Sequence, residues 1–399
     1  MFLKPLIRRN RAFIEAVVSF HQAGKIPANS YMLDLDTMQT NAQIMTDEAE
    51  KLGLKLFAMS KQFGRNPAAF NALARGGIER YVAVDMAGAR RIHAAGYKVS
   101  HIGHLVQIPR EEASAAAQMK PEYWTIYSYD KAKEVSDACG QVGHTQNILA
   151  RVFAGGDTFY MGHEGGFPAE EIVKVADTCD ALPGGRFAGI STFPALLFDP
   201  ETDEVVPTPN LKTLEKTAEA LAAAGRTDVE INAPGTTSSI VMPGLADAGA
   251  TQVEPGHGLT GSTPLHAVRD LPERPAMLYL SEVAHTYNGR PYCFGGGLYI
   301  DPVFPDYQVH ALVGADPDAA LNNVVDAMLP PLSAIDYYGL LDPNEGKPAR
   351  TGDTVIFGFR AQAFVTRAYV VPISGIASGE SKVEGIWFSD GRKIDWPSW

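Results

Sequence analysis

Eight short apolar segments alternate with helical segments between residues 54 and 254, and no other feature of the sequence limits the possible folds as much. The segments are rich in β-branched and aromatic residues, and each is short enough to be a buried strand. They are residues 54–59, 80–85, 99–103, 123–128, 147–154, 187–192, 229–233 and 250–254. Eight strands that alternate with helices predict an α/β fold, either a (β/α)8 TIM-type barrel or a doubly wound open sheet, and we expect the barrel.

The character of the sequence changes after about residue 270. Helical periodicity fades, and segments such as 276–287 and 353–376 are typical of strands separated by glycine turns. We therefore expect three parts: an N-terminal helical segment over residues 1–28, the barrel over residues 29–268, and a mostly β C-terminal domain over residues 269–399.

Charge and cysteine content narrow the class of protein. A net charge of -12 argues against nucleic acid as a partner, because binding to a phosphate backbone needs a basic face. No apolar run reaches the roughly 18 residues that span a bilayer, and charges interrupt the N-terminal segment too often for a signal peptide. The cysteines, Cys139, Cys179 and Cys293, form no Cys-x-x-Cys pair, so neither a disulfide framework nor a zinc cluster is indicated. We expect a cytoplasmic protein with reduced thiols and no membrane partner.

A lysine and a glutamate stand at the ends of the first and the last predicted strand. Lys61 follows strand 54–59, just before a glycine and a helix start, and Glu254 ends strand 250–254. These two strands become neighbours when a barrel closes, and the C-terminal ends of barrel strands carry the catalytic groups. Taken singly, a solvated surface lysine and a salt-bridged glutamate are the ordinary interpretations of such residues.

The same end of the barrel receives two glycine-containing loops, residues 232–239 after the seventh strand and residues 254–261 after the eighth. Loops at these positions frequently bind phosphate, because glycine lets backbone N–H groups approach the oxygens, although such glycines are also common in plain turns. An amine, a carboxylate and a phosphate cradle are the groups that pyridoxal 5'-phosphate (PLP) requires. The amine forms a Schiff base with its aldehyde, and the carboxylate can keep a proton on its pyridine nitrogen.

Four segments carry a resemblance to a known family. YMLDLDTMQTN (residues 31–41), FAMSKQFGRNP (57–67), GGIERYVAVDMAGARRIHAAG (76–96) and FAGISTFPA (187–195) resemble segments of the alanine racemase-like, fold-type III PLP enzymes. The lysine segment is most similar to the ornithine racemase-like branch, and the YhfX-type proteins look nearest overall. The resemblance implies a (β/α)8 barrel followed by a β domain, PLP as the cofactor, and Lys61 as the residue that carries it.

The sequence departs from the alanine racemase pattern at several positions. Glu254 stands where alanine racemases have the arginine that faces the pyridine nitrogen, and the segment is similar to the Glu-Pro-Gly-Arg motif of the ornithine and diaminopimelate decarboxylases. The resemblance implies that Glu254 keeps this nitrogen protonated and that Phe193 covers one face of the ring. Arg65 replaces a phosphate-binding tyrosine of the racemases, and His257 replaces the phosphate-binding arginine of the decarboxylases. The other expected cofactor contacts are Gly235, Thr236, Gly256 and Gly258.

Members of this family complete the site with a residue from the β domain of the partner subunit, a tyrosine in the racemases and a cysteine in the decarboxylases. The nearest counterparts are Tyr287 and Cys293, which either act as a second catalytic acid or only pack in a hairpin. The resemblance therefore implies a homodimer. Arg360 and Gln362 alternate with aromatic residues along one predicted strand, and Arg360 either binds a substrate carboxylate or lies on an ordinary sheet surface.

Three histidines near strand ends have open roles. His101 and His104, in the segment HIGH, lack the His-x-His spacing of a metal pair at a strand end, so we expect packing or a hydrogen bond to a neighbour. The same segment spells an aminoacyl-tRNA synthetase signature, but the lysine loop of that signature should follow it, whereas AMSKQ precedes it here. His163, in the loop 155–166, either approaches the cofactor or is a solvated loop residue.

We expect a PLP enzyme that acts at the α-carbon of an amino acid or related amine, in the first place an amino-acid racemase. Lys61 would be the base on one face, and Tyr287 or Cys293 the acid on the other. A PLP-dependent lyase or decarboxylase is the main alternative, because a protonated pyridine suits it at least as well. A noncatalytic PLP-binding protein and a metal-dependent barrel hydrolase are further alternatives. The β domain counts against the first of these and the missing His-x-His pair against the second, so we expect no metal.

Overall fold

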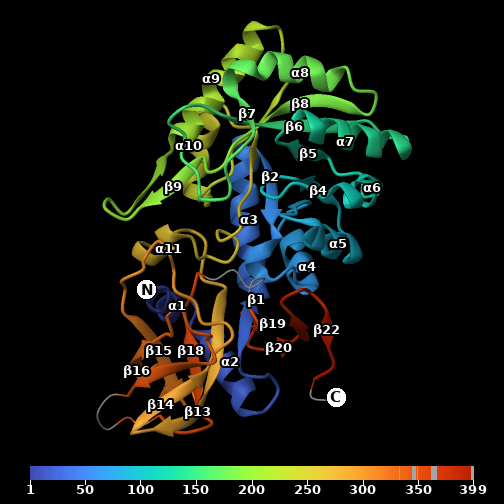
Figure 1. Ribbon diagram of the computed structural model, residues 1–399. Helices are drawn as coiled ribbons and strands as arrows, with labels where there is room; N and C mark the ends of the chain where they lie inside the picture. Colours follow the sequence, from blue (N-terminus) through green and yellow to red (C-terminus); the bar gives the residue numbers. More distant parts are fainter. Residues whose placement is uncertain (332, 344–346, 348, 361–365, 397–399) are drawn as a thin grey trace. The chain divides into compact units, whose positions relative to one another are not determined.

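The computed structural model describes residues 1–331, 333–343, 347, 349–360 and 366–396 (Figure 1). The chain divides into two compact units. The barrel unit contains residues 43–61 and 77–258, and the β unit contains residues 1–42, 62–76 and 259–399. Where the domain boundaries fall along the sequence stays a prediction.

The barrel unit is built on eight parallel strands that close on themselves. The strands, in order around the barrel, are β2 (Lys55–Met59), β3 (Arg80–Val82), β4 (Val99–Ile102), β5 (Tyr123–Ile126), β6 (Gln146–Phe153), β8 (Gly185–Ser191), β11 (Glu230–Asn232) and β12 (Gln252–Val253). The last strand pairs with the first, with Val253 opposite Leu56, so the sheet has no open edge. The predicted (β/α)8 barrel is confirmed, and the doubly wound sheet is excluded.

Helices cover the outside of these strands (Figure 1). They are α5 (Met86–Ala94), α6 (Ala113–Gln118), α7 (Tyr129–Gln141), α8 (Ile172–Asp180), α9 (Pro209–Ala223) and α10 (Met242–Asp247). Local chemistry fixes where they begin: the side chain of Ser128 caps α7 by accepting a hydrogen bond from Lys131 N, and Asp85 caps α5 in the same way. A short strand, β7 (Phe167–Pro168), and a hairpin of β9 (Leu196–Asp199) and β10 (Glu204–Pro207) interrupt this alternation. Within the described residues, no helix is both long and apolar enough to cross a bilayer.

The barrel interior changes from apolar to polar along the strands. Its apolar layer is a cluster formed by Phe57, Met59, Val82, Tyr123 and Leu149. Side chains two positions apart on a strand share a face, so the next inward positions on β5 and β6 hold Thr125 and Arg151. Both are fully buried. The polar layer therefore lies toward the C-terminal ends of the strands, the end that carries catalytic groups in barrels of this type.

The β unit is mostly antiparallel sheet, as predicted for the C-terminal domain. Six of its strands close a second barrel: β13 (Met277–Tyr287), β14 (Arg290–Phe294), β17 (Tyr338–Asp342), β16 (Val324–Met328), β15 (Val309–Gly314) and β18 (Thr354–Phe357). From β13 the sheet continues through β1 (Ser30–Asp34), β19 (Tyr369–Ser374), β21 (Ile386–Phe388) and β22 (Lys393–Ile394), with β20 (Lys382–Val383) beside β19. The predicted opening segment of the family pattern, residues 31–41, thus supplies a strand to this sheet.

Helices of the β unit include the N-terminal pair α1 (Leu3–Arg9) and α2 (Arg11–Gln22), and α4 (Pro67–Arg75), α11 (Pro264–Val268) and α12 (Pro317–Leu321). Helix α2 turns Phe13, Ile14 and Val17 into the core that also holds Leu278 and Ile356 of the sheet. This spacing is the apolar stripe of an amphipathic helix. Helix α3 (Leu35–Lys51) leads from the β unit into the barrel unit along the chain.

Candidate active site

Lys61 lies immediately beyond β2, in a short 3-10 helix over Ser60–Phe63. Burial lowers the pKa of its ammonium to about 8, although the charges of Glu254 and Asp85 act to raise it. Among the described residues, its Nζ has no hydrogen-bond or ion-pair partner. A lysine with this pKa is partly neutral near physiological pH, so its amine is available as a nucleophile or base.

Glu254 directly follows β12 and is almost fully buried. Its Oε1 accepts hydrogen bonds from His101 Nδ1 (2.6 Å) and Asn232 Nδ2 (3.0 Å). Its Oε2 is buried without a hydrogen-bond partner in the part of the chain that the structure describes. Burial acts to raise the pKa of this carboxyl, but the two nearby imidazoles and the accepted hydrogen bonds lower it to about 2. Glu254 is therefore a carboxylate with one occupied and one available oxygen.

The histidines of the HIGH segment both face Glu254. His101, on β4, bridges Glu254 and the hydroxyl of Thr125, which lies 2.7 Å from its Nε2. His104 places Nε2 at 3.3 Å from Glu254 Oε2. Burial lowers the pKa of His104 to about 3 despite the opposite effect of Glu254, so its imidazole is neutral at neutral pH. The expected hydrogen bond to a neighbour is present, and that neighbour is the predicted cofactor carboxylate.

Arg151 is a fully buried cation that sequence analysis missed. Its guanidinium donates to the Tyr127 hydroxyl (2.8 Å) and to the backbone carbonyls of His163 and Phe193 (3.0 Å each). Tyr127 in turn donates to the carbonyl of His104 (2.7 Å). An arginine inside the apolar segment 147–154 was the available signal. Arg151 therefore links the backbone segments that follow β6 and β8 directly, and the segment that follows β4 through Tyr127.

Phe193 follows β8 and stands between the histidines. Its ring meets His104 edge-on at 5.8 Å and lies 6.1 Å from His163 and 5.7 Å from Tyr160. His163 is half-buried rather than fully solvated. Burial, together with the positive charges of Lys61 and Arg151, lowers its pKa. The loop 155–166 therefore contributes an imidazole to the same aromatic cluster as Phe193.

The two loops expected to bind phosphate touch each other. A Cβ on Gly258 would lie 2.6 Å from the carbonyl oxygen of Thr237, so only glycine fits there without movement. Gly235 approaches the backbone of Leu196 equally closely, and the N–H of Thr236 already donates to the carbonyl of Leu196 (3.3 Å). Packing alone thus explains Gly235. Phosphate binding by Gly235, Thr236, Gly256, His257 and Gly258 stays a prediction.

Comparison with known proteins identifies the family. Residues 33–264 match the alanine racemase N-terminal domain, and residues 278–383 match the YhfX-like C-terminal domain. The chain belongs to the alanine racemase-like family. It is 38% identical over 398 residues, 99% of its own length and 100% of the relative's, to the uncharacterized protein YhfX of Escherichia coli strain K12.

Solved structures share the fold at low sequence identity. A D-threonine aldolase from Filomicrobium marinum matches 92% of this chain and 96% of its own with a TM-score of 0.68 and 18% identity. Alanine racemase from Clostridium difficile 630, in complex with cycloserine, covers 92% and 100% with a TM-score of 0.64 and 16% identity. D-threo-3-hydroxyaspartate dehydratase from Delftia sp. HT23 covers 91% and 97% with a TM-score of 0.62 and 17% identity. These likenesses show the fold, and the reactions named differ among them.

Three residues that the family pattern assigns to the site belong to the β unit. Arg65 is buried and has a left-handed backbone, with φ of 54°. Tyr287 ends β13 and is 64% exposed. Cys293, on β14, is fully buried, and burial raises the pKa of its thiol to about 12. Their roles toward the cofactor or substrate stay predictions.

Arg360 is not free to bind a substrate carboxylate in this structure. Its guanidinium donates two hydrogen bonds to the carboxylate of Asp301, through Nε (2.7 Å) and Nη2 (2.6 Å). This bidentate pair is largely buried. Gln362 lies outside the described residues. Arg360 was expected either to bind a substrate carboxylate or to lie on a sheet surface. The structure instead shows it in an internal ion pair.

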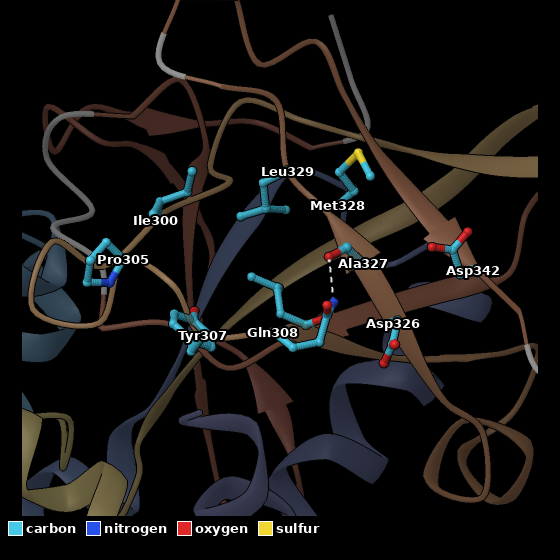
Figure 2. A pocket seen from close by; sticks show the side chains of 10 residues that line it. Ile300, Pro305, Tyr307, Gln308, Asp326, Ala327, Met328, Leu329 and Asp342 are labelled. Carbon is cyan, nitrogen blue, oxygen red and sulfur yellow. Dashed lines mark hydrogen bonds between the residues drawn. The ribbon is translucent and has the colours of Figure 1, made fainter.

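A pocket of about 230 Å³ lies within the β unit, beside β15, β16 and β17 (Figure 2). Its lining includes Gln308, whose side chain donates to the carbonyl of Ala327 (3.2 Å), and the carboxylates of Asp326 and Asp342. His310 pairs with Asp326 (2.8 Å) and Arg290 with Asp342, so both carboxylates already have a partner. The pocket therefore offers no reason to expect a ligand cation.

The buried polar groups of the barrel unit could hold either a metal ion or PLP. Ligand atoms of His101, His104 and Glu254 lie within 4.8 Å of one another, close enough to hold a metal ion. The 2.6 Å hydrogen bond between His101 and Glu254 is a competing use of the same atoms. PLP fits the two groups that a metal site leaves unexplained: among the described residues, Lys61 Nζ has no hydrogen-bond or ion-pair partner and Glu254 Oε2 has no hydrogen bond.

Proposed function

We propose that this chain is a PLP-dependent enzyme that acts at the α-carbon of an amino acid, with racemisation as the leading reaction. One observation carries the proposal. The C-terminal end of the barrel holds a lysine whose pKa is lowered to about 8 and a buried carboxylate with one available oxygen. Family membership supports PLP as the group that these two residues hold.

PLP, when bound, supplies an aldehyde that condenses with amines and a conjugated ring that takes up the electron pair of a broken bond at Cα. Lys61 would hold the cofactor through its amine, and Glu254 Oε2 would accept a hydrogen bond from the ring nitrogen. Phe193 would cover a ring face. The loops 232–239 and 254–261, with Arg65 and His257, would hold the phosphate.

Lys61 and Glu254 would each control a different proton. Lys61 takes the α-proton on one face, because burial leaves its amine partly unprotonated at working pH. Glu254 stays ionised, since its pKa lies far below neutrality, and so it would favour a proton on the ring nitrogen of the bound cofactor. Racemisation needs a second acid on the other face. We propose Tyr287 or Cys293 of a partner subunit for this role, on the family resemblance.

A lyase or decarboxylase is the second candidate. The observation that favours it is the ionised Glu254 in place of the arginine found in alanine racemases, because a protonated ring nitrogen stabilises a carbanion more strongly. Two of the similar solved structures are a D-threonine aldolase and a D-threo-3-hydroxyaspartate dehydratase. A noncatalytic PLP-binding protein would not need such an electron sink.

A homodimer is part of the proposal. Large apolar side chains are exposed on strands of the β unit, among them Tyr287, Phe294, Met328 and Tyr338. Exposed apolar patches of this kind often mark protein–protein interfaces. Sedimentation equilibrium of the purified protein tests this point, and a monomer at micromolar concentration would contradict it.

The decisive experiment incubates the PLP-loaded protein with pooled amino acids in heavy water. Deuterium at Cα with mixed configuration supports the racemase. Carbon dioxide, an aldehyde or a keto acid as product supports the lyase, and the amino acid that is consumed identifies the substrate. Absence of exchange and of product for every amino acid would reject enzymatic action on this class of compound.

A further inference from the structure

The barrel unit contains a polar layer that an ordinary barrel core does not need. His101 on β4, Thr125 on β5, Asn232 on β11 and Glu254 after β12 are all buried, and hydrogen bonds connect them. Burying polar groups costs free energy unless each finds a partner, and most barrel interiors avoid the cost with branched apolar side chains. A connected polar layer at the catalytic end therefore calls for a chemical reason.

His101 is fixed at both of its ring nitrogens. An ionised carboxylate only accepts hydrogen bonds, so Nδ1 is the donor in the 2.6 Å contact with Glu254 Oε1. Nε2 lies 2.7 Å from the Thr125 hydroxyl, and the ring packs edge-on against Phe57 at 6.1 Å. Thr125 and Phe57 together hold the imidazole in the orientation that aims Nδ1 at the carboxylate.

The donors on Glu254 are distributed unequally. Oε1 receives both hydrogen bonds, from His101 and Asn232, whereas Oε2 receives none from the described residues and has only the imidazole of His104 nearby, with Nε2 at 3.3 Å. Donors on one oxygen stabilise the anion and reduce its affinity for a proton. A proton shared between Oε2 and a basic nitrogen of a ligand is therefore held on the nitrogen.

We propose that His101 and Thr125 are positioning residues that act through Glu254 to keep the proton on the ring nitrogen of the cofactor rather than on the carboxyl group. The inference rests on the proposed function, because the nitrogen in question is that of PLP. It assigns a separate role to each residue: Glu254 would meet the ring, His101 would add its hydrogen bond to the effect of the nearby His104 and so lower the proton affinity of Glu254, and Thr125 would keep His101 aligned.

The test measures where the proton resides and not turnover. PLP labelled with nitrogen-15 in its ring is bound to the full-length protein, and the nitrogen resonance reports protonation directly. The wild-type protein should show a protonated nitrogen. His101→Phe removes the donor but keeps a ring of similar size, and it should move the proton partition toward the carboxyl group about tenfold or more, the effect of one charge-assisted hydrogen bond.

Matched variants separate this role from a structural one. His101→Asn keeps an N–H near the position of Nδ1 and should preserve most of the protonated signal. Thr125→Val should shift the partition in the same direction as His101→Phe, but less. Glu254→Gln should give an unprotonated nitrogen and calibrates the measurement.

A second measurement applies if a variant binds PLP too weakly for the nitrogen signal. It compares the affinity for PLP with the affinity for 1-deaza-PLP, which has carbon in place of the ring nitrogen. In a Lys61→Ala background, where binding is not covalent, His101→Phe should reduce the preference for PLP over the analogue. Equal losses of both ligands, or an unchanged nitrogen resonance, would overturn the inference. Failure of the wild-type protein to bind either ligand would instead overturn the proposed function.

Discussion

The two ends of the barrel each carry a lysine and a glutamate, and the two pairs behave in opposite ways. At the N-terminal ends of the strands, Lys55 on β2 forms an ion pair with Glu230 on β11. Glu230 also accepts hydrogen bonds from the hydroxyls of Tyr123 (2.9 Å) and Thr251 (2.6 Å), so both of its oxygens are occupied. At the opposite end, Lys61 Nζ has no hydrogen-bond or ion-pair partner in the described part of the chain, and Glu254 Oε2 has no hydrogen bond there, only the neutral imidazole of His104 at 3.3 Å.

The pKa values show what this difference means. Burial acts to lower the pKa of Lys55, but the hydrogen bond and charge of Glu230 outweigh it and raise the pKa above its ordinary value. For Lys61 burial prevails and the pKa falls to about 8. A complete pair stabilises the charged lysine and the fold, whereas an incomplete pair leaves a reactive amine. The comparison therefore separates a stabilising end of the barrel from the end at which we propose the chemistry.

Replacing the two lysines gives the largest expected contrast. Lys61→Ala should abolish the covalent label left by borohydride reduction of the PLP-treated protein, and it should slow exchange at Cα by on the order of 10³-fold. Lys55→Ala should keep both and lower the free energy of unfolding by about 1 kcal/mol, because its ammonium is partly exposed. Peptide mapping of the label is the measurement. A label on Lys55, or one that survives Lys61→Ala, would break the distinction between the two ends.

The two glutamates provide the next contrast. Glu254→Gln should slow exchange at Cα by about 10²-fold, because a neutral amide no longer holds a proton on the ring nitrogen. Glu230→Gln should leave exchange unchanged and destabilise the fold by about 1–2 kcal/mol through the loss of its charge-assisted bonds. Heavy-water exchange and urea unfolding, measured on both variants, test the pair. If Glu230→Gln slowed exchange and Glu254→Gln left it unchanged, the reaction would lie at the N-terminal ends of the strands, which would contradict the proposal.

The sequence predicted that Lys61 and Glu254 follow neighbouring strands because strand order is enough to do so. Once eight strands were recognised, the first and the last had to be neighbours, and the pairing of β2 with β12 confirms it. Lys61 and Glu254 follow those two strands directly. Neither step depends on side-chain orientation.

The rest of the site depends on orientation, which the sequence hides. Strands of a closed parallel barrel are buried on both faces, so their apolar runs do not show which positions point inward. Thr125, Arg151 and Asn232 were missed for this reason. The partner of His101 was missed because it lies 153 positions away along the chain. The sequence therefore predicted which strand ends are neighbours but not the hydrogen-bond network between them.

The pH dependence of amine reactivity sharpens the comparison further. In the cofactor-free protein, the rate of Lys61 with trinitrobenzenesulfonate should rise about tenfold per pH unit and level off near pH 8, its folded-state pKa. Between pH 8 and 10.5 the unfolded chain binds a proton at this residue that the folded protein does not. The contribution of Lys61 to the free energy of unfolding therefore increases with pH in that window. Lys55 should react only at higher pH, and peptide mapping distinguishes the two. Equal midpoints would contradict the assigned difference in environment.

The smallest expected effect is a change in PLP affinity caused by a substitution in the loops that follow β11 and β12. Gly258→Ala would bring a methyl group to within 2.6 Å of the Thr237 carbonyl, so the loops that follow β11 and β12 must separate. If these loops hold the phosphate, the dissociation constant for PLP should rise severalfold, and on the order of tenfold at most, since the cradle is displaced rather than removed.

Gly244→Ala, in helix α10, is the matched control, because nothing lies within 4 Å of the added methyl group. Alanine there should raise helix stability slightly and leave PLP affinity unchanged. Fluorescence titration in a Lys61→Ala background measures both constants, and equal affinities for the two variants would show that the phosphate lies elsewhere.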